Sequence, residues 1–191
     1  ICANDVDVPV GKIVYTQWLN TDGGIEADVT ISRIDHNTFM IVSACASERR
    51  DWFWLTQHSA DFDCLLTQDQ DGAIIGVMGR RSTELLSRVS DDPVAAYDLA
   101  YYESRRLQAG DLTLRANRLS YVGERGYELY LPRNQATALW QMLWAEGQTL
   151  NIRAAGFHAM NACRMEKGFK HWGDDIHDHI TPLQAGLGFA T

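Results

Sequence analysis

The chain of 191 residues has no apolar run long enough to cross a membrane as a helix, which requires about 20 apolar residues. Its longest apolar segments, such as residues 73–78, are far shorter. Basic residues are not in excess either: 17 Lys and Arg stand against 25 Asp and Glu, for a net charge of -8. Nucleic-acid binding needs a basic face that displaces counterions from phosphates. We therefore expect neither a membrane nor a nucleic acid as a partner.

Several motifs that mark cofactor or nucleophile sites are also missing. The glycines of residues 72–79 do not form a G-x-G-x-x-G pattern after a strand, which leaves a dinucleotide site without support. No G-x-S-x-G elbow of a serine hydrolase is present. The cysteines form no C-x-x-C pair and lie in or beside apolar segments at positions 2, 45, 64 and 163. This placement predicts buried free thiols and favours a reducing compartment.

The chain begins at Ile1, in an ordinary polar stretch without an initiator Met or an apolar signal segment. We expect this start to be a boundary inside a longer protein, so that any targeting signal lies outside the chain. Hydrophobic residues make up 46% and charged residues 22% of the sequence. That composition is typical of a globular domain with a hydrophobic core.

The first third of the sequence predicts three strands and a helix. Residues 11–19 are rich in β-branched and aromatic side chains, and a turn with two glycines follows at residues 20–24. Alternating residues 25–34 and the short segment 38–43 predict the next two strands. Ser47 is a suitable N-cap for a helix that ends near residue 57.

A second unit begins near residue 61. Its predicted strands are residues 62–67, 73–78, 101–107, 112–121 and 126–131. Its predicted helices are one that opens at Ser82, one whose apolar stripe comprises Ala136, Leu139, Trp140, Leu143 and Trp144, and one over residues 153–167. Strands interleaved with helices and hairpins predict an α+β fold near the split βαβ ferredoxin-like plan. We place the boundary between the two expected units at residue 60: residues 1–60 form part of the first unit, and residues 61–191 form the second unit together with the start of a return segment.

Two carboxylates stand out on the predicted strand over residues 25–34. With a period of two residues, Glu26 and Asp28 share one face, while apolar neighbours share the other. Carboxylates this close repel each other unless they are solvated or have partners. The pattern alone leaves two interpretations open: a solvated strand face, which is common, or a functional carboxylate.

Residues 120–129 form a second candidate segment. Two glycines flank Glu124 and predict a tight hairpin or bulge, and Tyr121 and Tyr127 bracket it. Two such rings suit a flat heterocyclic ligand. A plain hairpin with cross-strand aromatic side chains explains the pattern equally well.

The predicted helix at residues 153–167 carries Arg164 among mostly apolar side chains. An arginine in this setting either extends to solvent or pairs with a carboxylate. The following Lys167-Gly168 is typical of a helix C-terminus, where a cation faces the dipole and glycine ends the helix.

A histidine-rich loop follows, with His171, His177 and His179 near Asp174, Asp175 and Asp178. The His-Asp-His stretch could place two imidazoles on one side of an extended chain. Its spacing matches no defined set of metal ligands, and such loops are usually solvated surfaces. We therefore expect no metal site.

Ordered segments along the whole chain resemble the glycine-cleavage T-protein family of folate-binding aminomethyltransferases. The matches are the hairpin that carries the family's key aspartate (residues 18–20 and 23–30), the Tyr-x-Gly-Glu-x-Gly-aromatic-Glu signature (residues 121–128), the Leu-Arg-Leu-Glu-Lys-Gly helix end (residues 164–168) and the Pro-x-x-Ala-Gly-Leu stretch (residues 182–187). Residues 76–82 are similar to the family's Gly-Pro-Arg-Ser turn, with Arg80 in place of the usual proline.

The resemblance implies two ferredoxin-like α+β units around a cavity for tetrahydrofolate, without the C-terminal β-barrel that normally follows. Asp28 matches the family's catalytic aspartate. Glu124 matches the glutamate that hydrogen-bonds the pterin, and Tyr121 matches the aromatic residue beside it. Arg164 lies on the helix that supplies an arginine to the folate, although residues 159–161 lack the second arginine that this helix often carries.

The resemblance also implies a reaction. The family moves a one-carbon unit from an amine to tetrahydrofolate and yields 5,10-methylenetetrahydrofolate. Residues 7–20 resemble the segment that enters the folate domain of dimethylglycine and sarcosine dehydrogenases, and Val122 stands where T-proteins usually carry Thr. This likeness implies that FAD is bound only by a flavin domain upstream in the parent chain, which oxidises an N-methyl amine.

The parent protein is then expected in the cytoplasm of a bacterium or in the mitochondrial matrix of a eukaryote. Two alternatives stay open at this point. One is a stand-alone glycine-cleavage T-protein, which takes its aminomethyl group from a carrier protein. The other is a folate-binding scaffold or sensor that has lost turnover.

Overall fold

The computed structural model describes residues 1–191 and has the α+β fold expected from the sequence. Contacts divide the chain into two compact units. The first comprises Ile1–Gln68 and Lys170–Thr191, and the second comprises Asp69–Phe169. Each unit is built on one antiparallel sheet. None of the helices has both the length and the apolar character needed to span a bilayer.

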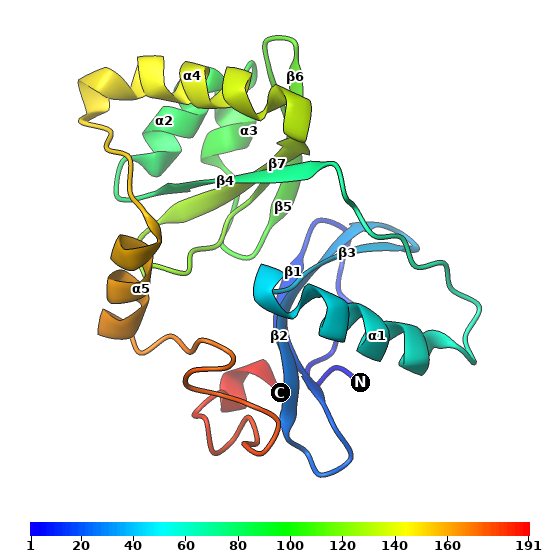
Figure 1. The fold of residues 1–191 in the computed structure, drawn as a ribbon. Helices are drawn as coiled ribbons and strands as arrows, with labels where there is room; N and C mark the ends of the chain where they lie inside the picture. The colour runs from blue at the N-terminus through cyan, green and yellow to red at the C-terminus, as the bar shows by residue number, and fades with distance from the viewer. The chain divides into compact units, whose positions relative to one another are not determined.

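The first unit contains a three-stranded meander (Figure 1). Its strands are β1 (Ile13–Leu19), β2 (Ile25–Asp35) and β3 (Thr38–Val42), close to the three predicted segments. Gly23 lies in the turn between β1 and β2 at a φ of +79°, where a residue with a Cβ would be strained. The turn signal in the sequence therefore located this hairpin correctly.

The helix α1 (Glu48–Ser59) follows a short 3₁₀ turn, η1 (Cys45–Ser47), and packs against this sheet. Trp54 and Leu55 of the helix contact a cluster on alternate positions of β1 and β2, formed by Trp18, Ala27, Val29 and Ile31. The two-residue period of a strand turns the residues between these positions to the opposite face. The alternation places Asp28 on that opposite face.

The C-terminal segment, Lys170–Thr191, packs with the first unit rather than with the second, where the sequence had suggested it would lie. Ile25 at the start of β2 is fully buried in a cluster with Ile176 and Leu187. The Trp172 indole nitrogen donates to the Ile25 carbonyl oxygen at 2.9 Å. Burial of these apolar side chains provides the physical reason for the return of the chain, because each of them would otherwise face water.

The second unit contains the strands β4 (Gly72–Met78), β5 (Ser104–Ala109), β6 (Leu112–Asn117) and β7 (Gly126–Pro132). Their order in the sheet is β4-β7-β6-β5. Its helices are α2 (Ser82–Val89), α3 (Pro93–Tyr97), α4 (Ala136–Gly147) and α5 (Phe157–Glu166), with short 3₁₀ turns η2 (Arg133–Gln135) and η3 (Gln148–Leu150). The last 3₁₀ turn of the chain, η4 (Gly188–Ala190), belongs to the first unit.

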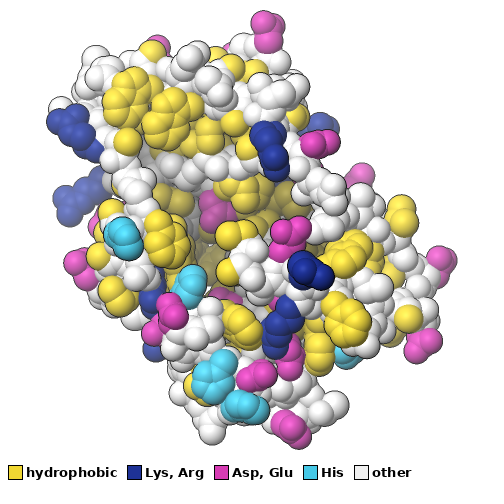
Figure 2. All heavy atoms as spheres, in the orientation of Figure 1, with side chains coloured by type: hydrophobic (Ala, Val, Ile, Leu, Met, Phe, Trp, Pro, Cys, Tyr) yellow, Lys and Arg dark blue, Asp and Glu magenta, His cyan; other side chains and the backbone are white.

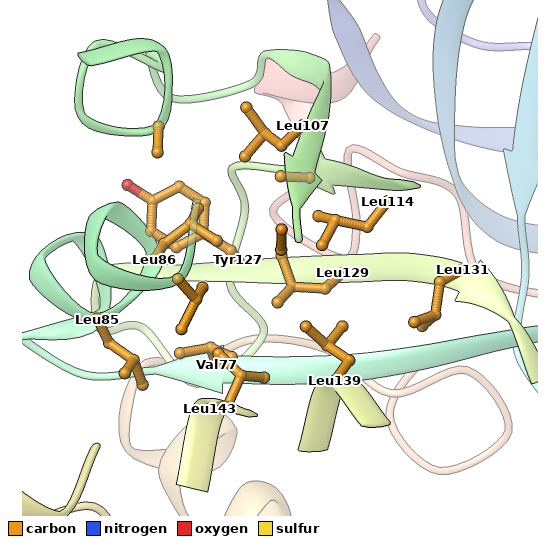
Figure 3. Packing of buried hydrophobic residues seen from close by; sticks show 14 of the residues in the cluster. Val77, Leu85, Leu86, Leu107, Leu114, Tyr127, Leu129, Leu131, Leu139 and Leu143 are labelled. Carbon is orange, nitrogen blue, oxygen red and sulfur yellow. The ribbon is translucent and has the colours of Figure 1, made fainter. Parts of the chain in front are cut away.

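The core of the second unit lies between one face of this sheet and the helices α2, α3 and α4 (Figures 1 and 3). Tyr127, Leu129 and Leu131 of β7 point into it at alternate positions, and all three are buried. The Tyr127 hydroxyl lies 2.8 Å from the Thr83 hydroxyl within this core. Tyr127 is therefore a core residue. Its place in the motif had suggested a wall of a ligand pocket, and that prediction is wrong.

Several local predictions differ from the structure. Residues 62–67, predicted as a strand, have no regular structure, and Leu65 is 91% exposed. Pro93 begins the short helix α3, which was not predicted, and Asp92 caps this helix by accepting from the Ala95 amide. The helix predicted from residue 153 begins at Phe157. These segments were mispredicted from their hydrophobic runs and local propensities. Whether a segment pairs with a strand, or where a helix begins, depends on neighbours that are distant in the sequence.

The amphipathic helix α4 has a narrower buried stripe than the sequence predicted. Leu139 and Leu143 are buried, whereas Trp140 and Trp144 are 46% and 38% exposed and stack on each other. Figure 2 shows hydrophobic side chains at the surface over this helix. The predicted stripe therefore included two residues, Trp140 and Trp144, that lie on the solvent side of the helix.

The cysteines are free but not buried as predicted. Cys45 and Cys64 are exposed, and Cys2 and Cys163 are partly buried. Phe62 and Leu65, the apolar neighbours of Cys64 in the sequence, are themselves exposed, so apolar residues nearby in the sequence did not indicate a buried thiol.

Candidate functional site

Asp28 is held at the centre of the first sheet by its neighbour on β1. Gln17 lies directly opposite Asp28 in the β1–β2 register. The Gln17 amide nitrogen donates to Asp28 Oδ1 at 2.9 Å, and the Gln17 side chain is fully buried. Tyr15 also hydrogen-bonds the Asp28 carboxyl group. Asp28 is thus a partly buried carboxylate with neutral hydrogen-bond partners, and it is not part of a solvated strand face.

Glu26, the second carboxylate on this face, has a different environment. The Arg50 guanidinium from α1 forms an ion pair with the Glu26 carboxylate and also donates to the Glu26 carbonyl oxygen. Arg50 stacks over the Trp172 ring at 4.4 Å, and the Asn20 amide donates to Glu26. The repulsion expected between Glu26 and Asp28 is therefore relieved at Glu26, where Arg50 supplies the opposing charge.

The pKa of Asp28 is raised above its ordinary value of 3.8 because burial disfavours the charged carboxylate. Hydrogen bonds from Gln17 and Tyr15, and the charge of the nearby His171, act in the opposite direction but do not cancel the effect of burial. A carboxyl group with a raised pKa binds protons more readily than a solvated one. This property suits a group that accepts and releases a proton near neutral pH.

The raised pKa predicts a gain in stability for Asp28→Asn at neutral pH. Burying Asp28 in its ionised form costs free energy. The stability that protonated Asp28 contributes is therefore complete below pH 3.8 and is lost as the pH rises through the raised pKa. The substituted asparagine carries no charge and avoids this cost. Urea unfolding across the pH range should show the variant more stable than the wild type at pH 7, with the difference vanishing in acid. An unchanged difference at all pH values would contradict the assignment.

The loop between β6 and β7 contains the Tyr-x-Gly-Glu signature and packs against the end of α5. It spans residues 118–125 and is therefore longer than the tight hairpin that was predicted. The Tyr121 ring stacks on Phe169 with centroids 6.4 Å apart. Gly123 has a φ of +71°, and a Cβ at this position would lie 2.1 Å from the Lys167 side chain. Glycine is thus favoured here by the backbone conformation, and the missing Cβ leaves room for the Lys167 side chain just beyond α5.

Arg164 on α5 is only 3% exposed, so it does not extend to solvent. Its Nε donates to Asn161 Oδ1 at 2.8 Å, and Nη1 donates to the Phe169 carbonyl oxygen at 3.1 Å. These bonds hold the chain beyond the helix end, including the Phe169 ring on which Tyr121 stacks. The structure therefore brings Arg164 and Tyr121 together through Phe169.

The two glutamates of the signature differ in environment. Glu124 is exposed in the loop, whereas Glu128 lies within β7 and is partly buried. Burial raises the pKa of Glu128, although the Tyr130 hydroxyl donates a hydrogen bond to its carboxylate. The sequence motif pointed to Glu124, and Glu128 was missed as a candidate. The sequence contained one signal for Glu128: it lies between the apolar residues Tyr127 and Leu129, an alternation that predicts a strand with the carboxylate on the face opposite the core.

The histidine-rich segment lies at the surface. His179 is 85% exposed, and the rings of His177 and His179 are 5.8 Å apart and nearly perpendicular. Figure 2 shows imidazoles exposed on this face of the molecule. No group of three or more His, Cys, Asp or Glu side chains is arranged to hold a metal ion.

The chain is similar to an oxidase, a regulatory subunit and a dehydrogenase. It is 38% identical over 190 residues to 4-methylaminobutanoate oxidase (formaldehyde-forming) of Paenarthrobacter nicotinovorans, covering 97% of this chain and 23% of the oxidase. It is 32% identical to the mitochondrial pyruvate dehydrogenase phosphatase regulatory subunit of Mus musculus, covering 96% of this chain and 21% of that protein. It is 30% identical to human mitochondrial sarcosine dehydrogenase, covering 97% and 22%. The chain thus spans less than a quarter of the length of these relatives.

The fold is similar to that of the glycine cleavage system aminomethyltransferase T from Bartonella henselae. The two structures share a TM-score of 0.84 and 25% sequence identity, over 96% of this chain and 48% of the other. All of residues 1–191 match the family described as the GCVT N-terminal domain. The α+β fold, the ordered motifs and this match over the whole length agree, and the chain belongs to the GCVT N-terminal domain family.

Proposed function

We propose that this chain is the tetrahydrofolate-binding, one-carbon-transfer part of an enzyme that oxidises an N-methyl amine. The observation that carries the proposal is Asp28. It combines the position of the family's key aspartate with partial burial, neutral hydrogen-bond partners and a raised pKa. A solvated strand carboxylate would have none of the last three properties.

In the proposed reaction, a nitrogen of tetrahydrofolate attacks an iminium carbon or formaldehyde derived from the amine. The new bond leaves a positive charge on that nitrogen until its proton departs. The amine, or water when formaldehyde is the substrate, then leaves as the second folate nitrogen closes the methylene bridge. Ionised Asp28 stabilises the cation and accepts the proton. Its raised pKa makes the carboxylate bind that proton more readily. Gln17 keeps the carboxylate in one orientation through its hydrogen bond to Oδ1.

The second unit is proposed to hold the pterin ring. A carboxylate orients such a ring by accepting from its N–H donors. The sequence resemblance assigned this role to Glu124, but its exposure favours Glu128, which is anchored in β7 and partly buried. Tyr121 is proposed to pack beside the ring, and Arg164 to position Tyr121 through Phe169. Arg164 then acts on the folate indirectly.

The link to amine oxidation is supported by the relatives. Two of them are named as an oxidase that forms formaldehyde and as a sarcosine dehydrogenase, and this chain spans 23% and 22% of their lengths. A parent chain of that kind would carry a flavin domain upstream, and capture by folate would limit the release of formaldehyde. A stand-alone aminomethyltransferase is a second candidate, favoured by the fold similarity to the glycine cleavage protein.

One experiment on the intact protein separates these candidates. We expect dimethylglycine or sarcosine to reduce the flavin of the intact protein. The protein should then form 5,10-methylenetetrahydrofolate and release less free formaldehyde when tetrahydrofolate is present. An intact protein without flavin that instead accepts an aminomethyl group from a lipoylated carrier would identify a T-protein.

A third candidate is a module that binds folate without turnover, because one relative is named as a regulatory subunit. Calorimetry with tetrahydrofolate, combined with the transfer assay, tests this candidate. Folate binding with no methylene transfer would favour the module, and no folate binding would remove all three proposals.

A further inference from the structure

Three polar side chains meet on the face of the second sheet opposite the one that packs on α2, α3 and α4. Glu128 and Tyr130 are two residues apart on β7 and alternate with the core residues Tyr127, Leu129 and Leu131. Asn117 of β6 lies directly opposite Glu128 in the register. Asn117 is fully buried, while Glu128 and Tyr130 are partly buried. Polar groups in such a position need partners, because an unmade hydrogen bond is costly there.

The three side chains form a connected chain of hydrogen bonds. The Asn117 side chain hydrogen-bonds the Tyr130 hydroxyl, and that hydroxyl donates to the Glu128 carboxylate at Oε2. Burial and the adjacent Glu128 raise the pKa of Tyr130, so the hydroxyl keeps its proton and stays a donor. The result is a fixed donor behind the carboxylate, on the same strand as the family's signature.

Other charged groups on this face do not replace Tyr130 as the partner of Glu128. Arg115 of β6 lies opposite Tyr130 and donates to the Ser104 hydroxyl at 3.0 Å. Arg106 of β5 lies opposite Arg115, one strand further away. On the other side, β4 places Gly76 opposite Glu128 and therefore contributes no charge or hydrogen-bonding side chain there.

We propose that Tyr130 is a positioning residue that holds the Glu128 carboxylate, in one orientation, for a ligand ring with adjacent N–H donors. The inference rests on the proposed folate-binding function and deepens it. Tyr130 acts through Glu128 and does not itself touch the ligand. Loss of the hydroxyl leaves the carboxylate freer to rotate and more easily protonated, since the donor that favours its charged form is gone.

The strand supplies a matched control for this proposal. Tyr130→Phe removes a hydroxyl from the polar face, and Tyr127→Phe removes one from the core face of the same strand, where it contacts Thr83. Both changes keep the ring. Tyr130→Phe removes the hydroxyl that bonds Glu128 and Asn117, and Tyr127→Phe removes the hydroxyl that bonds Thr83. Only the first should affect Glu128.

The test is calorimetric binding of 5-formyltetrahydrofolate to the full-length protein over a range of pH. Tyr130→Phe should weaken binding about three- to tenfold at neutral pH. As the pH falls, its affinity should decline at a higher pH than that of the wild type, because Glu128 becomes protonated earlier. Tyr127→Phe should lower the unfolding temperature but leave the affinity and its pH profile unchanged. Equal pH profiles for Tyr130→Phe and the wild type would overturn the proposal.

Two further variants keep the outcome unambiguous. In a Glu128→Gln background, Tyr130→Phe should have no additional effect on affinity, whereas a role independent of Glu128 would persist there and refute the proposal. Asn117→Ser should shift the pH profile in the same direction as Tyr130→Phe, and it serves as the test if Tyr130→Phe does not fold.

A measurement without folate separates this inference from the proposed function. Infrared difference spectra between each protein and its Glu128→Gln counterpart report the protonation of the Glu128 carboxyl group. Protonation at higher pH in Tyr130→Phe than in the wild type supports the positioning role even if the wild type binds no folate, in which case only the proposed function fails. The same protonation midpoint in both proteins removes the positioning role.

Discussion

Asp28→Asn in the intact protein should lower the formation of 5,10-methylenetetrahydrofolate by about 10³-fold, within the range typical of a lost general acid–base group. Asparagine keeps the shape of aspartate and can still accept from Gln17, so tetrahydrofolate should bind within severalfold of the wild type. What is lost is the negative charge and the ability to accept a proton. Single-turnover measurement of the methylene product, alongside calorimetry, separates transfer from binding.

Glu26→Gln is the matched control for Asp28→Asn. Glu26 lies two residues away on the same strand face, but its carboxylate is engaged by Arg50 and Asn20. Its replacement should reduce stability slightly and leave transfer close to the wild-type rate. Equal losses of transfer in the two variants would mean that the local charge, and not Asp28 as a proton acceptor, supports the reaction.

Glu128→Gln should weaken tetrahydrofolate binding by about 10- to 100-fold, the cost expected when a charged hydrogen-bond acceptor is lost from a partly buried site. Glu124→Gln should have a much smaller effect, because Glu124 is exposed in the loop before β7. Titration calorimetry on both variants decides which glutamate of the signature meets the pterin. A large loss for Glu124→Gln with none for Glu128→Gln would restore the assignment that the sequence resemblance implied.

These two replacements also test how far a motif alone can assign roles. The signature at residues 121–128 contains two glutamates of the same chemistry, four residues apart. In the structure one belongs to the loop and the other to the strand. Strand alternation could have indicated the difference, because Tyr127 and Leu129 mark a core-facing face and leave Glu128 on the other. The degree of burial of that other face could not be read from the sequence.

The sequence by itself determined the features that depend on local patterns. Alternation and the glycine turn located β1, β2 and β3, and helical spacing located α1 and α4, because backbone conformation follows from residues a few positions apart. The ordered motifs indicated the family, and the match over residues 1–191 confirmed it. They also drew attention to Asp28, whose alternation with buried apolar residues was correctly predicted.

The tertiary structure alone decided the environment of the candidate groups. Arg50 reaches Glu26 from a helix that begins more than twenty positions later, and Trp172 covers the start of β2 from the other end of the chain. Glu128 accepts a hydrogen bond from Tyr130, whose hydroxyl is in turn hydrogen-bonded by Asn117 on a neighbouring strand. Charge pairing and desolvation depend on which distant segments pack together, and local periodicity carries no information about that packing. For this reason the sequence could indicate Asp28 as a candidate, whereas only the fold showed how its surroundings differ from those of Glu26, and how the burial of Glu128 differs from that of Glu124.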